Sequence, residues 1–195
     1  SGTATLANYQ TALRSITYYS TSEDPTFTSS SRTITWVVTD ANSDGAGAAN
    51  SLGVTSIISI TPLSDAPVVT AGGTLSYTEN ASAAIIDNTI TISDDDDIQL
   101  VDGTITISSS FTAGDVLTLA TQNGINSTYN SSTGILTISG TATLANYQIA
   151  LRSITYHSTS EDPTETSNSR SITWVVTDAN SDGAGAANSS GVTST

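Results

Sequence analysis

A long internal repeat constrains this chain more than any other feature. Residues 1–57 recur as residues 139–195, a period of 139 − 1 = 138 residues, with seven substitutions between the two copies. Solenoid repeats have periods of roughly 20 to 50 residues, so near-identity at this longer period indicates tandem copies of a whole domain. The sequence therefore predicts the C-terminal part of one repeat over residues 1–65 and most of the next repeat over residues 66–195.

The predicted boundary lies in the segment Pro62-Leu-Ser-Asp-Ala-Pro67. Its two prolines flank Asp65 and Ala66. Proline restricts both its own backbone and that of the residue before it, so this segment favours an extended and stiff connector over a flexible one.

Short apolar alternations separated by turn residues run through both repeats. They favour half-buried strands, because side chains of a strand point to opposite faces of its sheet in turn. We expect an all-β fold, an antiparallel β-sandwich arranged in tandem domains. The expected strands are 15–19, 32–39, 54–61, 74–78, 84–93, 103–109, 115–120, 127–129 and 134–138, with a short helix or turn over 5–14.

The charge of the chain limits its partners. Eighteen acidic residues face four arginines and no lysine, which gives a net charge of −14. Such a chain is repelled by nucleic acid and by anionic membrane surfaces. Cysteine is absent, which excludes disulfides and thiolate metal sites. This acidic, Ser/Thr-rich composition is typical of an exposed bacterial surface protein, so an extracellular location is expected.

Four consecutive aspartates, Asp94 to Asp97, follow one of the expected strands. Adjacent carboxylates repel one another, so the run is costly unless a cation lies among them. Calcium is the usual cation for flexible loops of oxygen ligands. The alternative is a solvated acidic loop without a ligand.

Acidic motifs recur in a definite order along the chain. They are Glu79-Asn80, the pair Asp94 and Asp96, the segment Asn130 to Ile135, Glu161-Asp162, Asp178, and the linker Ser64 to Pro67. They resemble, in the same order, the E-N, D-x-D, T-G-x-I, D-R-E, A-x-D and linker motifs of a cadherin repeat, and the likeness extends over the whole chain. The chain looks like a cadherin-like domain of the kind arrayed in very large bacterial adhesins, including RTX-type ones, which implies a cadherin- or immunoglobulin-like sandwich. It departs from that pattern in having one acidic residue in the linker, no full L-D-R-E motif, and an insertion around residues 139–153.

The resemblance implies that calcium binds between successive domains, with ligands from both. At the junction within this chain it implies Glu23, Asp24 and Asp65 from the upstream repeat. From the downstream repeat it implies Asp94, Asp96 and Asp178. The same resemblance assigns Glu79, Glu161 and Asp162 to the following junction, and Asp40 and Asp44 to the preceding one.

These features predict a structural spacer of a long, calcium-stiffened cell-surface adhesin or filament. Its partners would be neighbouring repeats, or copies of itself. The alternative is a module that binds carbohydrate or another copy. We do not expect an enzyme, because the single histidine, His157, is replaced by Tyr19 in the other copy. A Ser-His-Asp triad therefore lacks a base, and a carboxylate pair for glycoside hydrolysis would need a cleft.

Overall fold

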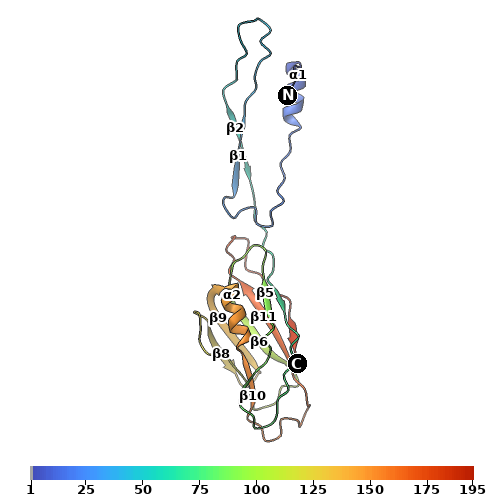
Figure 1. Ribbon diagram of the computed structural model, residues 1–195, viewed down its shortest axis with the longest axis vertical. Helices are drawn as coiled ribbons and strands as arrows, with labels where there is room; N and C mark the ends of the chain where they lie inside the picture. Colours follow the sequence, from blue (N-terminus) through green and yellow to red (C-terminus); the bar gives the residue numbers. More distant parts are fainter. Residues whose placement is uncertain (1) are drawn as a thin grey trace. The chain divides into compact units, whose positions relative to one another are not determined.

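The computed structural model describes residues 2–195, which divide into two compact units (Figure 1). The first unit ends at Pro62 and the second begins at Leu63. This division falls three residues before the boundary expected between Asp65 and Ala66. Residues 63–65 of the linker therefore belong to the second unit.

Residues 63–195 form a β-sandwich, as the alternation predicts. One sheet has the strand order β12-β11-β6-β9-β8, a second has β4-β10-β7, and β3 pairs with β5; every one of these pairings is antiparallel. The elements are β3 (Val68–Thr70), β4 (Ala84–Ile85), β5 (Thr91–Ser93), β6 (Gln99–Ser109), β7 (Asp115–Thr118), β8 (Asn126–Asn130), β9 (Ile135–Thr143), α2 (Leu144–Arg152), β10 (Thr155–Ser158), β11 (Ser171–Asp178) and β12 (Val192–Ser194).

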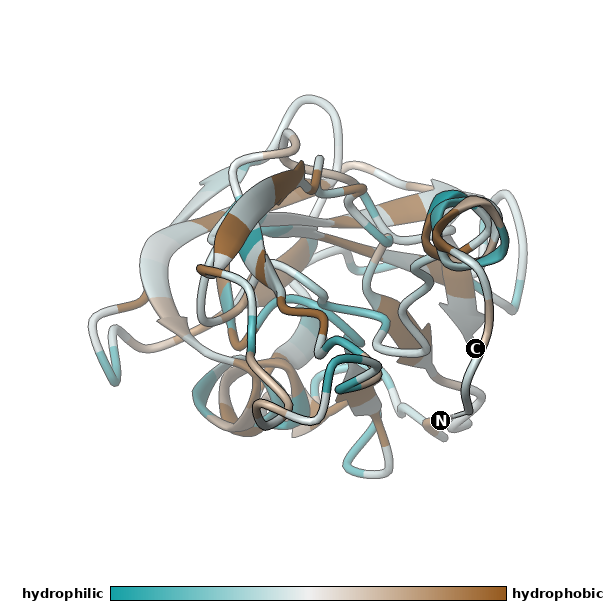
Figure 2. Cartoon of the chain, turned by 90° about the horizontal axis from the view of Figure 1, so that it is seen from above, coloured by the Kyte–Doolittle hydropathy of each residue, from teal (hydrophilic) through white to brown (hydrophobic). Residues whose placement is uncertain are grey.

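The core of this unit follows from strand periodicity. Every second residue of β11 is buried, and Trp174 at its centre is fully enclosed. Leu117 of β7 and Tyr156 of β10 belong to the same buried cluster as Ile105 of β6, so both sheets contribute to one core. Figure 2 shows hydrophobic residues, in brown, alternating with polar ones along the strands. The all-β expectation is confirmed.

Helix α2 connects the two sheets. Thr143 caps it by accepting a hydrogen bond from the Asn146 N–H at 3.2 Å. Its apolar face buries Tyr147, Ala150 and Leu151 in the core. The helix that the sequence left open as a helix or a turn is therefore a helix in this copy, and α1 (Leu6–Arg14) is its counterpart in the first.

The first unit also contains a hairpin of β1 (Ser31–Trp36) and β2 (Val54–Ser59), paired antiparallel with Trp36 opposite Val54. The expected strand over 15–19 is wrong here, because those residues have no strand structure. Their counterparts form β10, which pairs with β4 and β7. Both of those strands come from the segment between the repeated parts.

Residues 74–78 were expected to be a strand and are irregular. They nevertheless make one ordered contact with the C-terminal end of the unit. The Thr195 N–H donates to the Gly73 carbonyl at 3.0 Å, and the Leu75 N–H donates to the Thr195 carbonyl at 2.8 Å. This is the bonding pattern of a parallel pair, so the first and last segments of the unit run in the same direction.

Candidate functional site

The acidic run lies in the loop between β5 and β6, beside the loop that follows β11. Strands β6 and β11 are antiparallel neighbours, and Leu100 near the start of β6 lies opposite Asp178 at the end of β11. The topology therefore brings the run together with Asp178 and with Asp182 in the loop beyond it. We call these residues, Asp94, Asp96, Asp97, Asp178 and Asp182, the acidic cluster.

Hydrogen bonds to one oxygen of each carboxylate hold the two loops in place. Asp94 Oδ1 accepts from the backbone N–H groups of Asp96 at 3.2 Å and Asp97 at 2.9 Å. Asp97 Oδ1 accepts from the Ser181 N–H at 2.8 Å and also from the Ser181 hydroxyl. The hydrogen bonds between Ser181 and Asp97 join the loop after β5 to the loop after β11.

In Asp94, Asp96, Asp97 and Asp182 the second carboxylate oxygen has no hydrogen-bond donor, whereas both oxygens of Asp178 accept from backbone N–H groups. Asp96 and Asp97 are only 8% and 1% exposed. Buried carboxylate oxygens are nearly always paired, because desolvation without a partner is costly. The buried carboxylate oxygens without a partner among residues 2–195 are Asp94 Oδ2, Asp96 Oδ1, Asp97 Oδ2 and Asp182 Oδ2.

The linker also reaches this cluster. The Asp65 N–H donates to Asp96 Oδ2 at 2.8 Å. The neighbouring hydroxyl, Ser64 Oγ, is buried and has no partner in the described part of the chain. Asp65, the acidic linker residue singled out by the sequence, thus contacts the cluster through its backbone.

Electrostatics within the cluster favour protonation. Burial and the neighbouring Asp96 carboxyl raise the pKa of Asp94 to about 6, against the opposing effect of its two backbone hydrogen bonds. Burial, together with the charges of Asp97 and Asp96, also raises the pKa of Asp178. Like charges in a partly desolvated site have this effect, and a bound cation would reverse it.

We expect cation-free protein to lose stability as the pH rises. The folded-state pKa of Asp94, about 6, lies above the ordinary aspartate value of 3.8. Between these values the folded state binds more protons, so the free energy of unfolding falls as the pH rises through that interval. Urea unfolding of metal-stripped protein at pH 4.5 and 7 measures this slope.

The variant Asp94→Asn should flatten the slope, whereas Asp95→Asn, at the exposed position of the run, should keep it. A slope of the opposite sign in the parent protein contradicts the electrostatic account. At lower pH a second group, Asp87, acts in the other direction. Burial tends to raise its pKa, but hydrogen bonds from Thr89, Ser194, Gly72 and Gly73 hold that pKa well below its usual range. The stability that the charged Asp87 carboxylate contributes is therefore lost on acidification.

The structure brings together four of the residues implied by the resemblance: Asp65, Asp94, Asp96 and Asp178. Sequence reasoning missed Asp97 and Asp182 as members. Asp182 corresponds to Asp44 in the first copy, so the repeat carried a usable signal for it. Within residues 2–195, no three His, Cys, Asp or Glu side chains lie as close together as in a formed metal centre. The acidic cluster is a set of neighbouring carboxylates that is not arranged as a coordination sphere.

Several of the other implied ligands are engaged by hydrogen bonds within their own loops. Asp162 Oδ1 accepts from the Thr164 hydroxyl at 3.1 Å, in the loop after β10. In the first unit, Asp24 Oδ1 accepts from the Thr26 N–H at 3.1 Å. Asp40 Oδ1 accepts from backbone N–H groups on either side of its own loop. The remaining residues of the set, Glu23, Glu79 and Glu161, are exposed.

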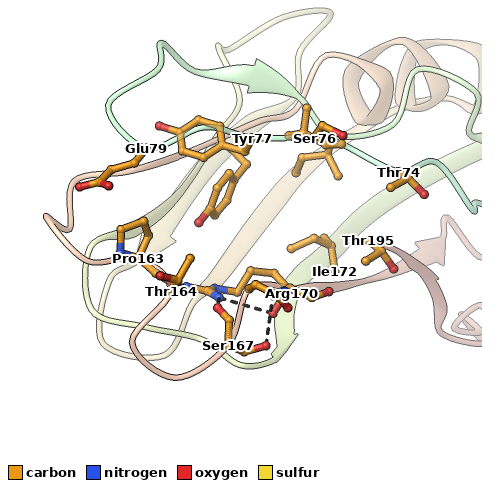
Figure 3. A pocket seen from close by; sticks show the side chains of 15 residues that line it. Thr74, Ser76, Tyr77, Glu79, Pro163, Thr164, Ser167, Arg170, Ile172 and Thr195 are labelled. Carbon is orange, nitrogen blue, oxygen red and sulfur yellow. Dashed lines mark hydrogen bonds between the residues drawn. The ribbon is translucent and has the colours of Figure 1, made fainter.

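A cavity of about 470 Å³ lies against β11 (Figure 3), lined by Tyr77, Glu79, Arg170 and Thr195 among others. The first copy shows which segment lies at the corresponding position. There, β2 continues along β1 so that its last residues lie opposite Arg32, the counterpart of Arg170. In the second copy β12 pairs only with residues 172–174. The cavity therefore corresponds to a strand groove and is weak support for a small-molecule pocket.

Comparisons with known proteins add nothing to the description of the site. No protein-family model, curated protein or solved structure matches the chain. Within the described residues, no helix is long and apolar enough to cross a bilayer.

Proposed function

We propose that this chain is a structural spacer from a long, extracellular surface protein, with a cadherin-like architecture, and that calcium stiffens its linker. The observation that carries the proposal is the set of four buried carboxylate oxygens without donors in the acidic cluster. A role in extension, rather than in catalysis, also suits near-identical tandem copies of one domain. The predicted partners are neighbouring repeats of the same polypeptide.

The donor set suits a hard divalent cation. Calcium takes about six to eight oxygen ligands in flexible geometry, mostly carboxylates, carbonyls and water. Asp94, Asp96 and Asp97 would hold the calcium ion through their unpaired oxygens, with Asp182 and the Ser64 hydroxyl beside them. Nitrogen and sulfur ligands are missing from this set, which disfavours zinc and copper.

Stiffening follows from the contact between linker and cluster. The Asp65 N–H is bonded to the same carboxyl, that of Asp96, whose other oxygen is unpaired. A cation that fixes this carboxyl also fixes residues 64 and 65, the connection to the preceding unit. Binding free energy is then spent partly on ordering the linker. Glu23 and Asp24 stay predicted ligands from the first unit.

Calorimetric titration of the metal-stripped chain with calcium tests the proposal. We expect saturable binding that Asp97→Asn weakens at least roughly tenfold, because it removes a charged and buried ligand. The matched control is Asp95→Asn, which lowers the charge of the same run equally but at an exposed position. Equal losses in both variants would indicate only a diffuse ion atmosphere, and no binding in the parent would refute the proposal.

A further inference from the structure

The first unit exposes residues whose counterparts form the core of the second. Ile16 is 59% exposed and Val38 is 39% exposed, whereas the corresponding Ile154 and Val176 are fully buried. The sequences around these positions are nearly identical in the two copies. The difference therefore arises from what covers them and not from the residues themselves.

The local structure of the first unit is already that of a complete repeat. Trp36 Nε1 donates to Ser56 Oγ at 2.9 Å, against 3.0 Å for the equivalent bond in the second copy. Arg32 Nη2 donates to the Pro25 carbonyl at 2.6 Å, again as in the second copy. The hairpin and its loop thus present a formed surface, and what differs is the tertiary cover.

In the second copy, residues 66–138 supply that cover. Strand β6 pairs along the whole of β11. Asp115, on β7, is buried and accepts from Arg170 Nε at 2.7 Å and from the Tyr156 hydroxyl at 2.6 Å. Further bonds run from Arg152 Nε to the Ile90 carbonyl and from the Ile92 N–H to Gln148 Oε1.

Every side chain of residues 139–195 that makes these contacts recurs at the corresponding position of the first copy. None of the seven substitutions between the copies falls on one of them. Within residues 2–62 as described, β1 pairs on one edge only, with β2, and Arg32 bonds to backbone carbonyls but to no carboxylate. The recurring residues are Gln10, Arg14, Tyr18, Arg32 and Ser56, the counterparts of Gln148, Arg152, Tyr156, Arg170 and Ser194.

We infer that residues 2–62 form a docking surface for a polypeptide segment of the same type as residues 66–138. A strand equivalent to β6 pairs antiparallel with the open edge of β1. An aspartate equivalent to Asp115 accepts from Arg32 and Tyr18. Apolar residues of the segment cover Ile16 and Val38. This inference is independent of the proposed function, because none of these contacts involves a cation.

A second copy of the chain does not supply the occupant. A segment of residues 1–195 contains two C-terminal parts, residues 1–57 and 139–195, and one N-terminal part, residues 66–138. The latter is already paired with residues 139–195 of its own chain. Association of copies therefore leaves as many open surfaces as it fills, and the surface requires an additional segment.

The test is to fuse a second copy of residues 66–138 ahead of Ser1, which reproduces the junction between Ile138 and Ser139. Amide hydrogen exchange in chelator is compared with that of the 195-residue chain. Residues 16–19 should change from rapid exchange to protection of roughly 100-fold or more, as in a core strand. The Tyr19/His157 substitution gives peptides from the two copies different masses, so each copy is followed separately.

Two controls make the outcome decisive. Asp115→Asn in the added segment should lower the protection of residues 16–19, whereas Ser131→Ala, in an exposed turn, should not. Protection of residues 63–195 in the same molecule reports that the rest of the protein is folded. Unprotected residues 16–19 beside a protected second unit would overturn the inference. Protection that appears in the 195-residue chain as dimers form would also overturn it, in favour of a second copy.

Discussion

Replacing Arg170 by alanine is expected to destabilise the second unit by about 3 to 5 kcal/mol, the usual cost of leaving a buried charge without its partner. The Asp115 side chain is fully buried, and the Arg170 guanidinium is its ion-pair partner at 2.7 Å. Arg170 also bonds to the carbonyls of Ser167 and Pro163, so its loss frees the loop that precedes β11.

The repeat provides the matched control. Arg32→Ala makes the same change in nearly the same local sequence, but in a unit where the arginine contacts no carboxylate among the described residues. We expect a change of less than about 0.5 kcal/mol, typical of a surface substitution. Chemical denaturation compares the two variants. Unfolding of the second unit is followed by the fluorescence of Trp174 in a Trp36→Phe background, and that of the first unit by the fluorescence of Trp36 in a Trp174→Phe background. Equal effects would contradict the account of Asp115 as the cause.

Calcium is expected to raise the heat-unfolding midpoint of the second unit by roughly 10 to 20 °C. A ligand at 1,000 times its Kd stabilises the folded state by about 4 kcal/mol, and each kcal/mol shifts the midpoint by a few degrees in a domain of this size. Part of the gain comes from offsetting the burial and the repulsion by Asp96 that raise the pKa of Asp94 to about 6. Scanning calorimetry at pH 7, with millimolar calcium or with chelator, measures the shift.

The double variant Asp96→Asn/Asp97→Asn should be more stable than the parent in chelator and nearly insensitive to calcium. Both parts follow from removing the charges of two buried carboxylates, each of which has one oxygen without a donor. Asp95→Asn should keep most of the calcium response. A double variant that still shows the full shift would place the cation elsewhere on the chain.

The sequence predicted the sandwich, and it singled out the linker and the acidic residues Asp94 and Asp96, for identifiable reasons. Alternation along residues 171–178 reports burial directly, because Trp174 and its neighbours at every second position face one core. Two prolines and a change of repeat mark the linker. Asp94 and Asp96 were found because adjacent carboxylates are costly wherever they lie.

The misses have tertiary causes. Asp97 differs from Asp95 only in burial, which depends on Ser181 from a loop 84 residues away. The expected strand over 15–19 has the same Ser-Ile-Thr-Tyr pattern as the residues that lead into β10, but a strand needs a partner, and β4 and β7 come from another part of the repeat. Local pattern could not show that the partner is missing.

The contact between the first and last segments of the second unit has a mechanical consequence. Gly73, Leu75 and Thr195 are bonded in the parallel pattern, so the two segments run in the same direction. Tension applied to the two ends of the unit would act along these hydrogen bonds in shear. Bonds loaded in shear share the force and break together, whereas those of a hairpin pulled open at its ends break one at a time. A domain joined in this way suits a tether that carries load.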